Sequence, residues 1–298
     1  MGQKDKLLEC VKNYGDRAAL ATAADCKSVL SEHGVRIPGS PPFRLVNIFM
    51  KKLITSGCSF STCWVPDHTW PSHLEQRLDG FQAEHYGMGS QGNGLISRSI
   101  IYAVSKALRT MPAEDILVGV MWSGAARHDY FVLETENLSI SDKKNTDGWL
   151  ENPTGFIPGA TKNWVIINNG WKFKEAKLYS DYFWDPLGCV ISTFEHILRT
   201  QWFLKQYNIK YFFTCYTDYV FGKNIWKDID TTTNVHTKYL NDMLDFDNFL
   251  PVNSISSWLA EKNILPVLTE TMDHPTRDQH IHFVEQVIIP HLKNKRYI

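Results

Sequence analysis

A run of apolar residues at 116–121, Ile-Leu-Val-Gly-Val-Met, limits the fold of this chain more than any other feature of its sequence. An apolar run without polar alternation is typical of a strand buried on both faces, as in a parallel sheet. Shorter runs predict further strands at 53–56, 81–86 and 209–215. Helical spacing of apolar residues predicts helices at 70–78, 96–108, 189–207, 254–261 and 276–292, with a short apolar piece at 264–268. This alternation indicates an α/β fold, with a mostly parallel sheet covered by helices on both faces.

The first 49 residues are expected to form an N-terminal extension of two short helices and a linker. The linker is predicted at 37–42, where prolines and a glycine end the helical pattern. Two short helices allow a DNA-binding helix-turn-helix, but few of their residues are basic. Residues 50–298 are predicted to form the main domain, with an irregular, aromatic-rich insertion at about 129–185. These aromatic residues are suited either to stacking on sugar rings or to a small core of their own.

The charge balance gives little reason to expect nucleic acid or a membrane as a partner. Lysine and arginine number 31 against 32 aspartates and glutamates, so the net charge of −1 produces no overall field. No apolar run approaches the roughly 18 residues of a spanning helix, and the N-terminus lacks the apolar stretch of a signal peptide. The six cysteines form no CxxC pair, so reduced thiols are expected. These features predict a cytoplasmic protein.

Polar and glycine-rich segments follow three of the predicted strands. They are 57–61 (Gly-Cys-Ser-Phe-Ser), 87–94, which is rich in glycine, and 122–124 (Trp-Ser-Gly). In a parallel sheet these segments meet at the carboxyl ends of the strands, where reactive groups gather. Ser59 is a candidate nucleophile there, and the glycines can direct backbone N–H groups at an oxyanion. His274, held extended by the following Pro275, is the candidate base.

Other chemistries fit the sequence less well. Gly87-x-Gly89-x-x-Gly92 matches a dinucleotide-binding pattern. It follows the second predicted strand rather than the first, however, and no acidic residue ends a strand about 20 residues later. Histidines also occur near the predicted site, but the spacing of His68, His73 and His85 fits no familiar metal triad. His280 and His282 are predicted on different faces of a helix, which argues against a shared metal ion. Neither a metal nor a cofactor is therefore expected.

The order of these segments resembles the SGNH (GDSL-like) hydrolases, a family of serine esterases and lipases. The resemblance covers residues 50–293 and implies a flavodoxin-like, three-layer α/β/α sandwich. The family's first block is a Gly-Asp-Ser type, so the resemblance makes Ser59 the nucleophile, with Cys58 where aspartate is usual. The family's last block places a histidine before a proline, which implies that His274 is the catalytic base.

The same resemblance assigns the oxyanion hole and the substrate contacts. The backbone N–H groups of Ser59 and Gly92 would hold the oxyanion, with help from Asn93 or Ser123. The family's third block normally contributes an asparagine, but this chain has Trp-Ser-Gly-Ala-Ala-Arg at 122–127. Ser123 is expected to donate a hydroxyl there, and Trp122 and Arg127 are expected to contact the substrate, the arginine through an anionic group.

The acid that orients the histidine is the second departure from the family. An aspartate is usual three residues before the histidine, where this chain has Thr271. Glu270 and Asp273 stand four residues and one residue before His274, and Asp273 is the nearest candidate. A Ser-His dyad without a carboxylate is the alternative.

Together these features predict a serine hydrolase that cleaves a carboxylic ester. The expected substrate is an O-acylated carbohydrate or a small-molecule ester, and the reaction would need no cofactor. The alternative is a catalytically inactive module of the same fold that binds a glycan or a protein partner. Divergent copies of this kind are expected in bacteria or their phages.

Overall fold

The computed structural model describes residues 50–62, 68–131, 164–168, 174–218, 230–263 and 274–298. The chain divides into two units, residues 1–48 and 49–298, and all of the described residues belong to the second. The predicted N-terminal helices and linker, and the short apolar piece at 264–268, lie outside the described residues.

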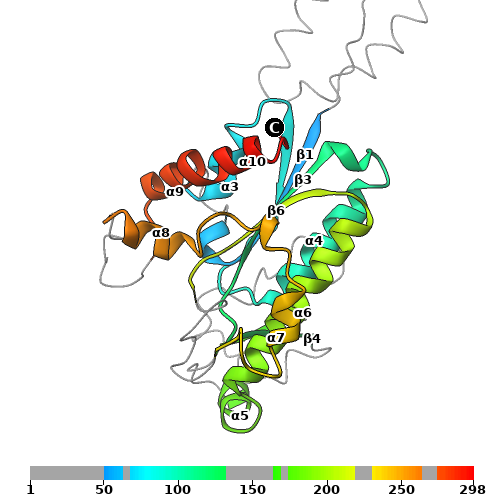
Figure 1. Cartoon of the computed structure of the whole chain (residues 1–298). Helices are drawn as coiled ribbons and strands as arrows, with labels where there is room; N and C mark the ends of the chain where they lie inside the picture. Colours follow the sequence, from blue (N-terminus) through cyan, green and yellow to red (C-terminus); the bar gives the residue numbers. More distant parts are fainter. Residues whose placement is uncertain (1–49, 63–67, 132–163, 169–173, 219–229, 264–273) are drawn as a thin grey trace, which may run out of the picture. The chain divides into compact units, whose positions relative to one another are not determined.

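A parallel sheet forms the centre of this unit (Figure 1). In the described residues it has four strands: β1 (Lys51–Ser56), β2 (Phe81–His85), β3 (Ile116–Trp122) and β6 (Lys210–Cys215). Their order across the sheet is β2-β1-β3-β6, and every neighbouring pair is parallel. The predicted α/β fold with a mostly parallel sheet is therefore confirmed. β3 is buried along its whole length, as its apolar run requires.

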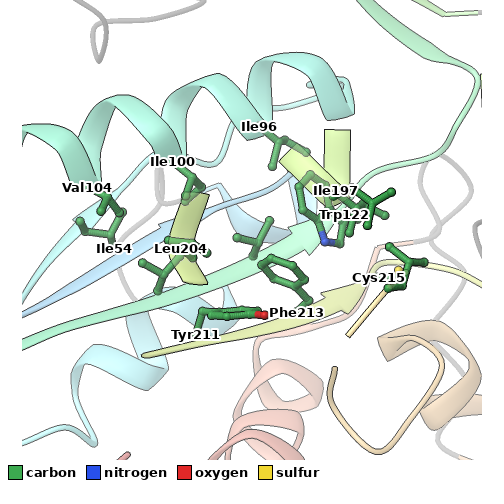
Figure 2. Close-up of a cluster of buried hydrophobic side chains, with 14 of the residues drawn as sticks. Ile54, Ile96, Ile100, Val104, Trp122, Ile197, Leu204, Tyr211, Phe213 and Cys215 are labelled. Carbon is green, nitrogen blue, oxygen red and sulfur yellow. The ribbon is translucent and has the colours of Figure 1, made fainter. Parts of the chain in front are cut away.

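Helices cover both faces of the sheet. On one face, α4 (Asn93–Ala107) and α6 (Pro186–Gln206) pack on the inward side chains of alternate strand residues, among them Ile54 and Tyr211 (Figure 2). On the other face, α3 (Trp70–Glu75) and the C-terminal helices pack on the intervening residues, such as Leu53 and Leu117. Successive side chains of a strand point to opposite faces, so the two apolar clusters make a three-layer α/β/α arrangement.

The C-terminal helix is longer than one regular α-helix. α9 (Arg277–Phe283) continues through a π-helical turn (Val284–Ile288) into α10 (Ile289–Asn294). Pro290 has no N–H and its ring crowds the carbonyl four residues earlier, and a widened turn directly before it accommodates both effects. The helix begins at a capping box, in which Thr276 and Gln279 bond each other's backbone N–H groups.

The predicted insertion has more regular structure than the sequence indicated. β4 (Arg127–Phe131) and β5 (Trp164–Asn168) pair in antiparallel fashion as a separate two-stranded sheet, and α5 (Lys174–Tyr182) follows. The described residues of this unit also form two further helices, α7 (Lys238–Asp242) and α8 (Ile255–Glu261), and short 3₁₀ turns at Ser59–Ser61, Ala113–Asp115 and Phe246–Asn248. Among the helices described, none has the length and apolar character needed to cross a membrane.

Candidate active site

Ser59 begins the 3₁₀ turn that directly follows β1. The turn is closed by the Ser61 N–H, which donates to the Cys58 carbonyl at 2.8 Å. Gly57 is required at this point, because a Cβ there would lie 2.3 Å from Ser61 Oγ and 2.9 Å from the Met121 carbonyl oxygen. Cys58 is fully buried, so the position that holds aspartate in the resembled family packs in the core here. The turn therefore presents Ser59 at the carboxyl end of β1.

His274 meets this serine, although 215 positions separate the two residues. Its Nε2 lies 2.7 Å from Ser59 Oγ, within hydrogen-bond distance. The histidine stands two residues before the capping box that starts α9, which fixes its backbone at the helix entrance. The Phe60 ring packs on the imidazole, with ring centroids 4.8 Å apart. A serine and a histidine in this contact have the geometry of a nucleophile and its general base.

The predicted acid, Asp273, lies outside the described residues, as do Glu270 and Thr271. The assignment of Asp273 as the acid that orients His274 therefore stays a prediction.

The predicted oxyanion donors Gly92 and Asn93 have other partners. The Gly92 N–H donates to Asp129 Oδ1 at 3.0 Å, and the Leu95 N–H donates to Oδ2 of the same carboxylate at 2.9 Å. Asp129, from β4, thus takes up backbone donors at the start of α4, which a helix leaves without internal partners. Burial of this carboxyl group raises the pKa of Asp129 to about 6, although the two N–H bonds and the charges of Arg127 and Arg98 act to lower it.

The Asn93 side chain joins two of the strand-end segments to each other. Its Oδ1 accepts from the Ser123 N–H at 2.7 Å, and its Nδ2 donates to the Ser123 carbonyl at 3.0 Å and to Thr193 Oγ1 at 3.1 Å. Asn93 is 2% exposed. The assignment of the Gly92 N–H and the Asn93 side chain to the oxyanion hole is therefore corrected, because both groups form hydrogen bonds within the protein.

A different glycine of the same loop lies next to the Ser59 turn. The Met88 N–H donates to the Gly57 carbonyl at 3.1 Å, and a Cβ on Gly87 would lie 2.1 Å from the Ser61 carbonyl oxygen. Gly89 follows directly, and its N–H has no hydrogen-bond partner among the residues that the structure describes. The next residue, Ser90, adopts a left-handed backbone with φ of 53°. Gly89 is itself buried, and its N–H is left without a described partner beside the nucleophile turn. The sequence signal for it is the Gly-x-Gly pair at 87–89.

In the third segment, at the end of β3, Trp122 and Ser123 are fully buried, whereas Arg127 is only half-buried. Trp122 is fully buried, and its ring makes a T-shaped contact with Phe213 at 5.3 Å between centroids (Figure 2). The prediction that Trp122 contacts substrate is therefore wrong. Ser123 is also fully buried, and its Oγ accepts from Arg127 Nη1 at 2.8 Å. Arg127 remains half-buried at the start of β4.

Two of the remaining histidines belong to the core. His73 and His280 are each 1% exposed. Burial, and then the neighbouring His68, His73 and His274, lower the pKa of His280 to about 3, so this side chain is neutral at physiological pH. His85 bonds Thr55 Oγ1 at 2.8 Å and Glu75 Oε2 at 3.2 Å instead of facing these histidines. In the described part of the chain, no three potential ligands are arranged to hold a metal ion.

No protein-family model matches the chain, and no curated protein matches it. Among solved structures, it is similar to the Bacillus subtilis protein YxiM, with 10% sequence identity and a TM-score of 0.40 over 82% of this chain. The chain spans only 56% of the length of that protein. It is also similar to a member of the lipolytic protein G-D-S-L family from Veillonella parvula, with 9% identity and a TM-score of 0.39 over 79% of this chain and 96% of that one. Similarity at this level leaves the function to be argued from the site itself.

Proposed function

We propose that this protein is a serine hydrolase of the SGNH type that cleaves a carboxylic ester. The observation that supports the proposal most directly is the 2.7 Å contact between His274 Nε2 and Ser59 Oγ. Both residues stand at positions that the resembled family uses for its nucleophile and base. The serine follows β1 and the histidine precedes the last helix.

The contact supports a two-step mechanism. Ser59 Oγ attacks the acyl carbonyl carbon while His274 Nε2 takes the hydroxyl proton, and a tetrahedral oxyanion forms. The C–O bond to the alcohol then breaks, and the imidazolium returns the proton to the leaving oxygen. Water attacks the acyl-enzyme with His274 again as base, which releases the carboxylic acid and restores the serine.

The oxyanion would be held by the backbone N–H groups of Ser59 and Gly89. The hydrogen bond between Met88 and Gly57 keeps the Gly89 loop beside the nucleophile turn. Two such donors would account for a large part of the rate enhancement, because removing one typically lowers kcat roughly 10²–10³-fold. Ser123 would contribute indirectly, through the Asn93 bonds that fix its segment.

Exposed aromatic rings next to α5 support an O-acylated carbohydrate as the substrate. Tyr182 and Phe183 are each 76% exposed, and flat aromatic faces are suited to stacking on sugar rings. We expect Phe183→Ser to raise the KM for an acetylated xylo-oligosaccharide without raising the KM for 4-nitrophenyl acetate. Trp202→Ser is the matched control, because Trp202 is another exposed aromatic residue, on α6. Equal KM values for wild type and Phe183→Ser would remove the support for a carbohydrate.

Ester turnover tests the activity itself. The wild-type protein should release acid from 4-nitrophenyl acetate and from acetylated xylo-oligosaccharides, and Ser59→Ala should release none. Ser61→Ala is the control, because Ser61 is buried and its Oγ accepts from the Trp70 indole at 2.9 Å. It should unfold at a lower temperature but keep turnover. A folded Ser59→Ala protein that turns over ester at the wild-type rate would contradict the proposal.

A catalytically inactive binding module is the second candidate. Two observations favour it: the asparagine of the family's third block is absent, and Gly92 and Asn93 bond within the protein. An inactive module would turn over no ester in the panel and would still bind the deacetylated oligosaccharide in isothermal titration calorimetry.

A further inference from the structure

Arg127 carries a half-buried positive charge whose direct contacts among the described residues are with neutral groups. Its Nη1 donates to Ser123 Oγ at 2.8 Å, and its guanidinium lies over the Tyr216 ring, 5.1 Å from the centroid. None of the ion pairs between described residues includes Arg127, whereas half-buried Lys52 pairs with Glu84 at 2.6 Å.

The nearest acid along the strand, Asp129, is close enough for its charge to interact with that of Arg127, but it makes no direct ion pair with the guanidinium. Asp129 stands two residues further along β4, and its two carboxylate oxygens accept from the Gly92 and Leu95 N–H groups instead. A guanidinium has five N–H donors, and a single hydroxyl accepts from Arg127 among the described residues. The remaining donors form a planar fork of the kind that binds carboxylate or phosphate with two bonds.

A continuous row of aromatic rings connects this guanidinium with the Ser-His pair. The Tyr216 ring contacts Phe60 at 5.2 Å between centroids, and Phe60 contacts the His274 ring at 4.8 Å. Ser59, Ser123 and Tyr216 follow the adjacent strands β1, β3 and β6, so their segments lie at the same edge of the sheet. The charge is therefore fixed close to the reacting groups, on the side of Tyr216.

We infer that Arg127 binds an anionic group of the substrate, a carboxylate or an equivalent oxyanion in the same molecule as the scissile ester. This inference rests on the proposed esterase function and adds the substrate class to it. A cation that is partly withdrawn from water and makes no direct ion pair among the described residues is costly to keep. A bound oxyanion would supply that direct ion pair when the ester enters the site.

Two matched pairs of esters test the inference. In the first pair, 3-acetoxybenzoate carries the negative charge on the alcohol part of the ester, and 3-acetoxybenzamide is its neutral counterpart. In the second pair, mono-4-nitrophenyl succinate carries the negative charge on the acyl part, and the methyl ester of that compound is its neutral counterpart. The readout is the ratio of kcat/KM for the anionic ester to kcat/KM for the neutral one. Wild type should prefer the anionic member of at least one pair, and that pair shows which side of the ester carries the charge.

Arg127→Met should lower this ratio roughly 10- to 100-fold, the worth of a charge-assisted hydrogen bond. Arg127→Lys should retain part of the preference, because it keeps the charge but loses the fork. Arg109→Met is the control, since Arg109 is exposed beyond the C-terminal end of α4, and its ratio should equal that of wild type.

A purely structural role for Arg127 would lower both rates and leave the ratio unchanged, which would overturn the inference. A wild-type ratio near one for both pairs would overturn it as well. If no ester is hydrolysed, the proposed function fails, and binding of benzoate against benzamide by wild type and Arg127→Met decides the inference separately. Preference for benzoate that disappears in Arg127→Met supports it, and equal binding contradicts it.

Discussion

Replacing His280 by glutamine should remove a large part of the acid sensitivity of the fold. His280 is 1% exposed, and its ring makes a T-shaped contact with Phe60 at 6.4 Å between centroids. Burial, together with the nearby His68, His73 and His274, lowers the pKa of His280 from 6.5 to about 3. Glutamine has a similar size and does not titrate in this range.

The sign and size of the effect follow from proton linkage. Between pH 6.5 and pH 3 the unfolded chain binds a proton at His280 and the folded protein does not. The free energy of unfolding contributed by this site is therefore fully present above pH 6.5 and falls as the pH falls, by about 1.4 kcal/mol per pH unit. From pH 7 to pH 5 the loss is about 2 kcal/mol. Asp129 has the opposite effect on the free energy of unfolding. Its pKa is raised to about 6, and its burial is less costly when it is protonated, so its contribution to stability increases as the pH falls through that value.

Urea denaturation at pH 5, 6 and 7, followed by tryptophan fluorescence, measures this difference. The loss of unfolding free energy between pH 7 and pH 5 should be smaller by about 2 kcal/mol in His280→Gln than in wild type. His282→Gln is the matched control, because His282 stands on the same helix and is exposed, and it should show the wild-type loss. An unchanged loss in His280→Gln would refute the reasoning that this histidine is buried in its neutral form.

Three further predictions concern the site and its supports. His274→Ala should lower kcat by roughly 10²–10⁴-fold with little change in melting temperature, measured by steady-state kinetics and thermal denaturation, and a wild-type kcat would exclude His274 as the base. Asn93→Ala should lower the free energy of unfolding by about 2–4 kcal/mol in urea, because it leaves buried backbone groups of Ser123 without partners, and a loss under about 1 kcal/mol would contradict that role. A chain that begins at Met50 should fold and keep ester turnover, as gel filtration and kinetics would show, and an insoluble product would show that the preceding residues belong to the domain.

The central sheet could be predicted because its signals are local. The apolar run of β3 and the alternation of strands with helices fix the class of fold without any long-range contact. Ser59 and His274 could be proposed as site residues for a similar reason, since one follows a strand directly and the other stands before Pro275 at a helix start. The contact between Ser59 and His274 then follows from the order of the chain around the sheet.

The errors came from long-range contacts and from one overlooked pattern. The Gly92 N–H is hydrogen-bonded to Asp129, which lies 37 positions later on a strand that the sequence does not predict. β4 and β5 are short and are separated by more than 30 residues, so no local turn signal marks their pairing. The burial of Trp122, by contrast, could have been predicted, because it shares the strand face of Val118 and Val120.

The measurement that tests the central claim most directly is labelling of the intact protein with a fluorophosphonate. The reagent reacts only with a serine that a base activates, and mass spectrometry of the digested protein locates the adduct. The account predicts one adduct on Ser59 of the wild-type protein, loss of the adduct in Ser59→Ala, and strongly slowed labelling in His274→Ala. A folded wild-type protein that remains unlabelled, or an adduct on Ser61 instead, would contradict it.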